Sequence, residues 1–123
     1  SAATDAQTIS FNYTAPGGGF GGVETVNLAN ISPGARIVDV SVEVNTALSN
    51  YTGAVEPTVE VGTASDLDQF MTGDESDLSS AGTYTANPNY LYPASQNIDL
   101  SLKARINHRA STSGDFVVTV TYV

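Results

Sequence analysis

Few side chains in this sequence have the chemistry that catalysis requires. The chain contains one histidine, His108, and no cysteine, so nucleophilic catalysis would need a serine, His108 and an acid acting together. His108 lies in a polar segment, 107–114, and the nucleophile motif Gly-x-Ser-x-Gly is absent from the sequence. A zinc site would have to combine one histidine with carboxylates alone, which is an unusual ligand set. We therefore expect His108 to be a solvated loop residue and the protein not to be an enzyme.

A glycine-rich stretch matches a nucleotide-binding motif in spacing only. Gly17, Gly19 and Gly22 fit the pattern Gly-x-Gly-x-x-Gly, which cradles a pyrophosphate when a helix begins at the loop. The residues that follow, 23–28, have the pattern of a strand, so we predict a hairpin loop and no bound cofactor. Phe20 is the one large apolar side chain among these glycines, and we expect it to be an anchor for a protein partner.

An acidic segment follows the middle of the chain. Its carboxylates lie within twelve residues, at Asp66, Asp68, Asp74, Glu75 and Asp77. Calcium favours several oxygen ligands from one loop, but the spacing of an EF-hand is absent because Phe70 occupies a ligand position. The pattern favours a solvated acidic rim, and we predict no metal site. Whether 74–77 binds calcium stays open.

The overall charge restricts the classes of partner. The chain of 123 residues has thirteen acidic and four basic side chains, a net charge of −9. Such a protein repels phosphate backbones and anionic lipid surfaces, so we expect neither nucleic acid nor membrane as a partner. Three of the four positive charges, Lys103, Arg105 and Arg109, fall within seven residues. This basic stripe either docks on an acidic partner or pairs with the protein's own carboxylates, and both interpretations remain open.

The elements that position these residues show a period of two. From Ile98 to Ile106, apolar and polar residues alternate without exception, the pattern of a strand with one buried face. A Val-rich alternation over 38–44 is the strongest strand signal. Further strands are predicted at 8–13, 23–28, 57–62, 82–85, 90–92 and 115–123, and a short helical turn at 65–71.

Short strands separated by turn residues predict an all-β fold, an antiparallel β-sandwich of the jelly-roll type. We expect one domain over 8–123, preceded by a flexible N-terminal arm at 1–7. The predicted core is apolar and strand-borne. It consists of Phe11, Val38, Val40, Val42, Val59, Val61, Leu100, Leu102, Ile106, Phe116, Val118 and Val120.

Several of these segments together resemble one family of proteins. They are the strand 37–44, then 46–47, 57–66 with its Val-x-Val-Gly-x-x-x-Asp pattern, 70–71, 81–84, and the closing Val-x-Val-x-Tyr strand 118–122. In this arrangement the chain resembles small β-rich virion proteins of tailed bacteriophages, of the head-decoration (cement) type. The resemblance implies a structural protein on the capsid surface. Its expected partners are the major capsid protein and other copies of itself, in a homotrimer or homodimer.

Two other functions remain alternatives. An extracellular carbohydrate-binding module would use tyrosines near loops to stack on sugars, and Tyr51, Tyr84, Tyr90 and Tyr92 are candidates, although the chain has no tryptophan. A subunit of an extracellular filament would donate a terminal strand to its neighbour. On the capsid interpretation, we expect the arm 1–7 and the loop 17–22 to order on the partner, with Phe20 as the buried anchor.

Overall fold

The computed structural model describes residues 6–18 and 22–123, and Phe20 lies outside them. In this part of the chain there are eight strands and one short 3-10 turn, η2 (Gly73–Glu75). No described helix is long and apolar enough to span a membrane. The strands are β1 (Gln7–Thr14), β2 (Val23–Ile31), β3 (Arg36–Ser49), β4 (Thr58–Thr63), β5 (Gly82–Ala86), β6 (Tyr90–Leu91), β7 (Leu100–Asn107) and β8 (Ser113–Tyr122).

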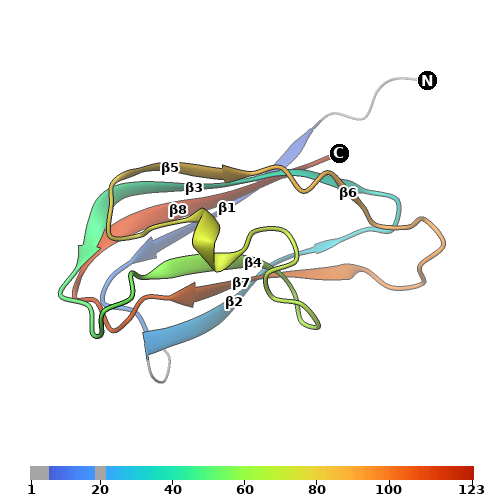
Figure 1. Cartoon of the computed structure of the whole chain (residues 1–123). Helices are drawn as coiled ribbons and strands as arrows, with labels where there is room; N and C mark the ends of the chain where they lie inside the picture. Colours follow the sequence, from blue (N-terminus) through green and yellow to red (C-terminus); the bar gives the residue numbers. More distant parts are fainter. Residues whose placement is uncertain (1–5, 19–21) are drawn as a thin grey trace.

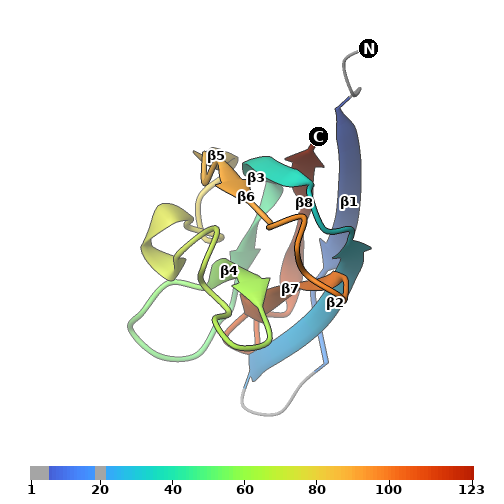
Figure 2. The same cartoon turned by 90° about the vertical axis from the view of Figure 1, so that its right-hand side faces the viewer.

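The strands form two antiparallel sheets packed face to face. One sheet has the order β1-β8-β3-β5, with β6 also paired to β3, and the other has the order β2-β7-β4. Figure 1 shows the first sheet above the second, and the view in Figure 2 shows the two layers from one end. The chain crosses between sheets so that β1 pairs with β8 and β2 with β7, a nesting typical of a jelly roll. The predicted antiparallel all-β sandwich is confirmed.

The core forms where the inward faces of the two sheets meet. In β3 and β8, Val40 lies opposite Val120 and Val42 opposite Val118, and all four are buried. The second sheet contributes buried residues from β4 and β7 through the same alternation. The structure confirms nine predicted core residues: Val40, Val42, Val59, Val61, Leu102, Ile106, Phe116, Val118 and Val120. Phe11 and Leu100 are only partly buried, against the edge of this core.

The prediction for Val38 is wrong because β3 contains a bulge. The pairing of β3 with β8 shifts between Ile37 and Asp39, so one extra residue enters β3 at this point. As a result Ile37 is fully buried, whereas Val38 is half-buried and belongs to no core cluster. The alternation read from the sequence is correct from Val40 to Val44, where the register is regular.

The start of β7 also differs from the prediction. Ile98 was expected on the buried face, but it is 72% exposed and precedes the strand, which begins at Leu100. The Tyr92 hydroxyl donates a hydrogen bond to the Ile98 carbonyl at 2.7 Å. This backbone group is therefore held by the preceding loop and not by a neighbouring strand.

The predicted helical turn at 65–71 is absent. The Asp66 carbonyl accepts hydrogen bonds from the amides of Thr63 (2.9 Å) and Gln69 (3.2 Å), which closes a tight turn. Immediately afterwards the amides of Phe70 (2.8 Å) and Met71 (3.0 Å) donate to the Val61 carbonyl of β4. Pairing with β4 uses the donors that a helix would need, so the helical turn forms later, at η2.

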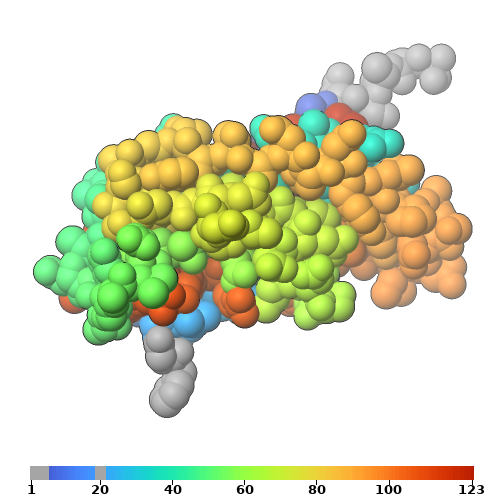
Figure 3. Space-filling view, viewed as in Figure 1, coloured from blue at the N-terminus to red at the C-terminus, as the bar shows by residue number. Residues whose placement is uncertain are grey.

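Residues 70–78, here called the closing segment, cover the outer edge of β4. The Met71 carbonyl accepts from the Val61 amide at 3.0 Å, and the buried Ser76 hydroxyl accepts from the Val59 amide at 3.0 Å. Leu78, fully buried, then links the sheets, because its amide donates to the Pro57 carbonyl and its carbonyl accepts from the Leu48 amide. The space-filling view shows the chain after β4 lying over the space between the sheets (Figure 3). One side of the sandwich is thus closed by the chain itself.

The bulge yields a paired prediction on stability. Val40→Ala removes two buried methyl groups and leaves a cavity, so we expect it to lower the free energy of unfolding by about 2–4 kcal/mol. Val38→Ala makes the same chemical change at the half-buried bulge position and should cost at most about 1 kcal/mol. Urea denaturation of both variants measures the difference. An equal or larger loss for Val38→Ala would contradict the placement of the bulge.

Candidate functional site

Two of the three residues of the basic stripe lie together on the outer face of the three-stranded sheet. Lys103 and Arg105 are alternate residues of β7, the central strand of that sheet. The Arg105 guanidinium forms an ion pair with Glu60 on β4, and its Nε donates to the Glu60 carboxylate at 2.6 Å. Lys103 Nζ donates to the side-chain amide oxygen of Asn27 on β2. Arg105 is therefore neutralised within the chain, whereas Lys103 has a neutral partner and keeps its charge on this face.

Arg109 lies apart from that face, in the turn between β7 and β8. Its φ of 53° is in the left-handed region, and its backbone joins three segments. Its amide donates to the Gly22 carbonyl at 3.0 Å, and its own carbonyl accepts from the Thr52 amide at 2.7 Å. The side-chain Nε is buried without a hydrogen-bond partner among the described residues. The contacts of Arg109 fix the turn, and they do not extend the positive surface of Lys103.

The expectation of a solvated His108 is wrong: the residue is 2% exposed. Its place in the chain explains this, because the inward-facing alternation of β7 through Leu102, Ala104 and Ile106 continues by one more step to His108. The polar residues around His108 hid this continuation of the alternation in the sequence. Extending the period of two beyond Ile106 would have identified His108 as an inward-facing residue.

His108 anchors the connection between β1 and β2. The Ala110 amide donates to Nδ1 at 3.2 Å, which leaves the ring proton on Nε2, and Nε2 donates to the Gly18 carbonyl at 2.6 Å. The ring stacks on Tyr13, with 5.8 Å between ring centroids. A Glu24 carboxylate oxygen lies 3.7 Å from Nε2. The imidazole is thus engaged through both nitrogens, and its role in this arrangement is to hold backbone.

Tyr13 is the inner wall of this cluster. It stacks on Phe116 with 4.9 Å between centroids, and its hydroxyl is buried with no hydrogen-bond partner among the described residues. Burial, and secondarily the nearby Glu24 carboxylate, raises the pKa of Tyr13 to about 12. The phenol therefore stays neutral across the physiological range, and it contributes packing and no acid–base chemistry.

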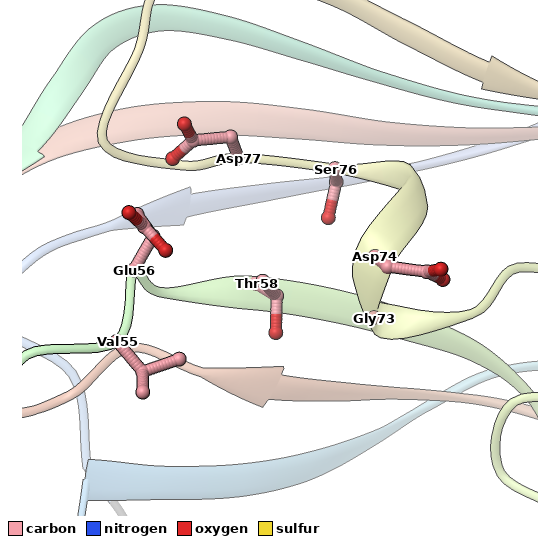
Figure 4. Close-up of a pocket in the computed structure, with 7 residues that line it drawn as sticks. All are labelled: Val55, Glu56, Thr58, Gly73, Asp74, Ser76 and Asp77. Carbon is pink, nitrogen blue, oxygen red and sulfur yellow. The ribbon is translucent and has the colours of Figure 1, made fainter.

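A shallow acidic pocket lies beside the closing segment. Its volume is about 540 Å³. Figure 4 shows that its lining side chains come from the start of β4 and from η2 with its flanks: Val55, Glu56, Thr58, Gly73, Asp74, Ser76 and Asp77.

Two of the three carboxylates that line this pocket, Asp74 and Asp77, are used by local turns. Asp74 accepts a hydrogen bond from the Thr72 hydroxyl, and Asp77 accepts from the Ser79 amide at 3.0 Å. Among residues 6–18 and 22–123, no three histidine, cysteine or acidic side chains are placed to hold a metal ion together. The side chains of Asp74, Glu75 and Asp77 thus cap turns in and beside the closing segment.

The fold has counterparts among solved structures. A chain of the cyanophage Pam1 capsid asymmetric unit matches 96% of this chain with a TM-score of 0.65 and 18% identity, over 84% of its own length. A chain of the acidic stable capsid structure of Helicobacter pylori bacteriophage KHP30 matches 98% of this chain, with a TM-score of 0.64 and 18% identity, over 89% of its own length. At the level of fold, the resemblance to phage virion proteins is confirmed. No protein-family model and no curated protein sequence matches the chain.

The Tyr13 hydroxyl, which has no hydrogen-bond partner among residues 6–18 and 22–123, gives a testable prediction. At neutral pH, Tyr13→Phe should leave the free energy of unfolding unchanged or raise it by up to about 1 kcal/mol, because a buried hydroxyl without a partner is costly. Because the folded-state pKa is above the unfolded value, the unfolded chain loses this proton first. The part of the folding stability that depends on a neutral Tyr13 phenol is therefore fully present below about pH 10. It is lost as the pH rises toward 12.

The measurement is a series of chemical denaturations between neutral and alkaline pH. The wild-type protein should lose more stability than Tyr13→Phe over this alkaline range. Identical slopes for the two proteins would contradict a raised pKa at Tyr13.

Proposed function

We propose that this protein is a structural component of a phage virion that decorates the capsid surface and bridges neighbouring capsid subunits. The observation that carries the proposal is the fold match, which extends over almost the whole chain in two independent phage capsid structures. A match of 96–98% of this chain leaves little room for an added catalytic unit within it. The implied partners are the major capsid protein and other copies of this chain.

The side chains with reactive or ligand-binding chemistry are mostly engaged within the chain, which supports a function based on surface contacts with other proteins. The one histidine is buried with both ring nitrogens engaged, and two of the pocket carboxylates, Asp74 and Asp77, bond within local turns. Three of the four tyrosines named as candidates for sugar stacking are likewise used internally. Tyr84 donates to the Ser80 carbonyl, Tyr92 donates to the Ile98 carbonyl, and Tyr90 packs against Phe70. These contacts favour attachment to other proteins over recognition of a small ligand.

Attachment to the capsid would use the positively charged part of an otherwise acidic surface. Lys103 is the strongest candidate, because its described partner, Asn27, is neutral and its charge is available to an acidic partner. Arg105 is a weaker one, since it would have to exchange Glu60 for a capsid carboxylate. Arg109 is the weakest of the three, because its backbone and its buried Nε belong to the turn between β7 and β8. Phe20 and the arm 1–7 complete the proposed contact set. On a lattice, many identical sites act together, so a modest affinity at each site gives stable decoration.

The test is decoration of empty heads assembled from the major capsid protein encoded in the same genome. The wild-type protein should bind these heads at saturating occupancy, and cryo-electron microscopy should show it on the outer surface in contact with more than one subunit. No binding to such heads, or density elsewhere in the particle, would contradict the proposal.

A matched pair of variants tests the contribution of the basic stripe. We expect Lys103→Ala to weaken binding by roughly 5–30-fold, the effect of losing about 1–2 kcal/mol of interaction at one contact. Arg36→Ala removes the same charge from β3, where the guanidinium is bonded to Asn89, and should bind as the wild type does. Equal weakening by both variants would show that only net charge matters and that Lys103 is not a contact.

A further inference from the structure

The strands at the sheet edges are not protected equally. The closing segment covers β4, β5 and β6 are only five and two residues long, and β2 carries a register shift between Asn27 and Ala29. β1 has none of these features: its eight residues pair with β8 in unbroken register and include no charged residue and no proline. Charges, bulges, prolines and covering segments are the means by which proteins prevent strand addition at an edge. In the described part of the chain, β1 is the long edge without such protection.

The ladder between β1 and β8 shows which backbone groups of β1 are open. The Ala15 amide donates to the Gly114 carbonyl at 2.9 Å, and this pair continues the register of β1 with β8. Hydrogen-bonded pairs alternate along an antiparallel ladder, so the odd-numbered residues of β1 bond to β8. The amides and carbonyls of Thr8, Ser10 and Asn12 therefore point away from β8. No described segment supplies a backbone hydrogen bond to them.

The side chains of this edge form a symmetric pattern about Ser10. Ile9 and Phe11 lie on the inner face and are only partly buried against the core. Thr8, Ser10 and Asn12 lie on the outer face and are exposed. Reading outward from Ser10, the order in both directions is apolar and then polar. Figure 2 shows β1 at the rim of its sheet with no strand beyond it.

We propose that β1 pairs with β1 of a second copy of this chain, antiparallel, with a two-fold axis at Ser10. In this register Ser10 faces Ser10, and Thr8 faces Asn12, in hydrogen-bonded pairs that use the open amides and carbonyls. Ile9 then faces Phe11 of the second copy in non-hydrogen-bonded pairs, where side chains approach most closely. The two sheets of order β1-β8-β3-β5 become one continuous sheet, and the partly exposed rim of each core is covered.

A second copy fits this edge better than an unrelated strand. A two-fold interface requires a surface that complements itself, and the symmetric pattern about Ser10 supplies one. Each copy has a net charge of −9, so two copies approach best along a strand without charges, which β1 is. The inference concerns the free protein and does not depend on attachment to a capsid.

The register is tested by a pair of single cysteine variants, since the chain has no cysteine of its own. Across the axis, the two Cα atoms of residue 10 would be about 5.5 Å apart, within disulfide range. The two Cα atoms of residue 8 would be roughly 14 Å apart, because they are offset by four residues along the strands. We expect mild oxidation to convert Ser10→Cys into a covalent dimer and to leave Thr8→Cys uncrosslinked. Both side chains are exposed on the same face, so random collisions would crosslink both variants equally.

A proline variant tests the hydrogen bonding separately. Ser10→Pro removes an amide that points to the free edge and removes no bond to β8, so the melting temperature should change little. In sedimentation velocity, the wild type should be a dimer and Ser10→Pro a monomer. A monomeric wild type at all concentrations, equal crosslinking of the two cysteine variants, or a dimeric and folded Ser10→Pro would each overturn the proposal. If Ser10→Pro fails to fold, the cysteine pair alone decides.

Discussion

The need to satisfy the backbone groups at the edges of two small sheets determines much of this structure. On the β4 side, the chain meets that need with its own residues: Met71 pairs with Val61, Ser76 bonds to Val59, and Leu78 joins β4 to β3. This closing segment forms part of the face seen in Figure 3, contains η2 and lines the acidic pocket. The β1 side has no equivalent among the described residues. This difference between the two sides leaves β1 as the edge at which the proposed second copy adds.

Alternation of apolar and polar residues was sufficient to predict the sandwich and most of its core. It succeeded for β4, β7 and β8 because a regular strand exposes alternate residues to opposite faces. It failed at Val38 because a bulge inserts one residue, and no local residue preference distinguishes that position from its neighbours. The helical turn at 65–71 was predicted wrongly because the amides of Phe70 and Met71 donate to the Val61 carbonyl of β4 and not to a helical carbonyl. Both errors arise from pairing between segments, which a local pattern does not contain.

Some features of the candidate functional residues were predictable from the alternation, and others were not. The two-residue alternation alone placed Lys103 and Arg105 on one face of their strand. The pairing of Arg105 with Glu60 depended on which strand lies beside β7. His108 was misplaced because polar neighbours outweighed its position in the alternation, which in fact extends beyond Ile106. Phe20 lies outside the described residues. The uncharged edge of β1 is visible in the sequence, but its significance depends on knowing that β1 is the last strand of its sheet.

The central claim is that β1 is an open edge completed by a second copy, and amide hydrogen exchange measured residue by residue tests it most directly. The amides of Ile9, Phe11 and Tyr13 bond to β8 and should be protected at every protein concentration. Those of Thr8, Ser10 and Asn12 should exchange rapidly where the protein sediments as a monomer and become protected as the dimer forms. Protection of the second set in the monomer would mean that the edge is already covered within the chain. Rapid exchange of that set at all concentrations would mean that no strand adds there, and either result would contradict the account.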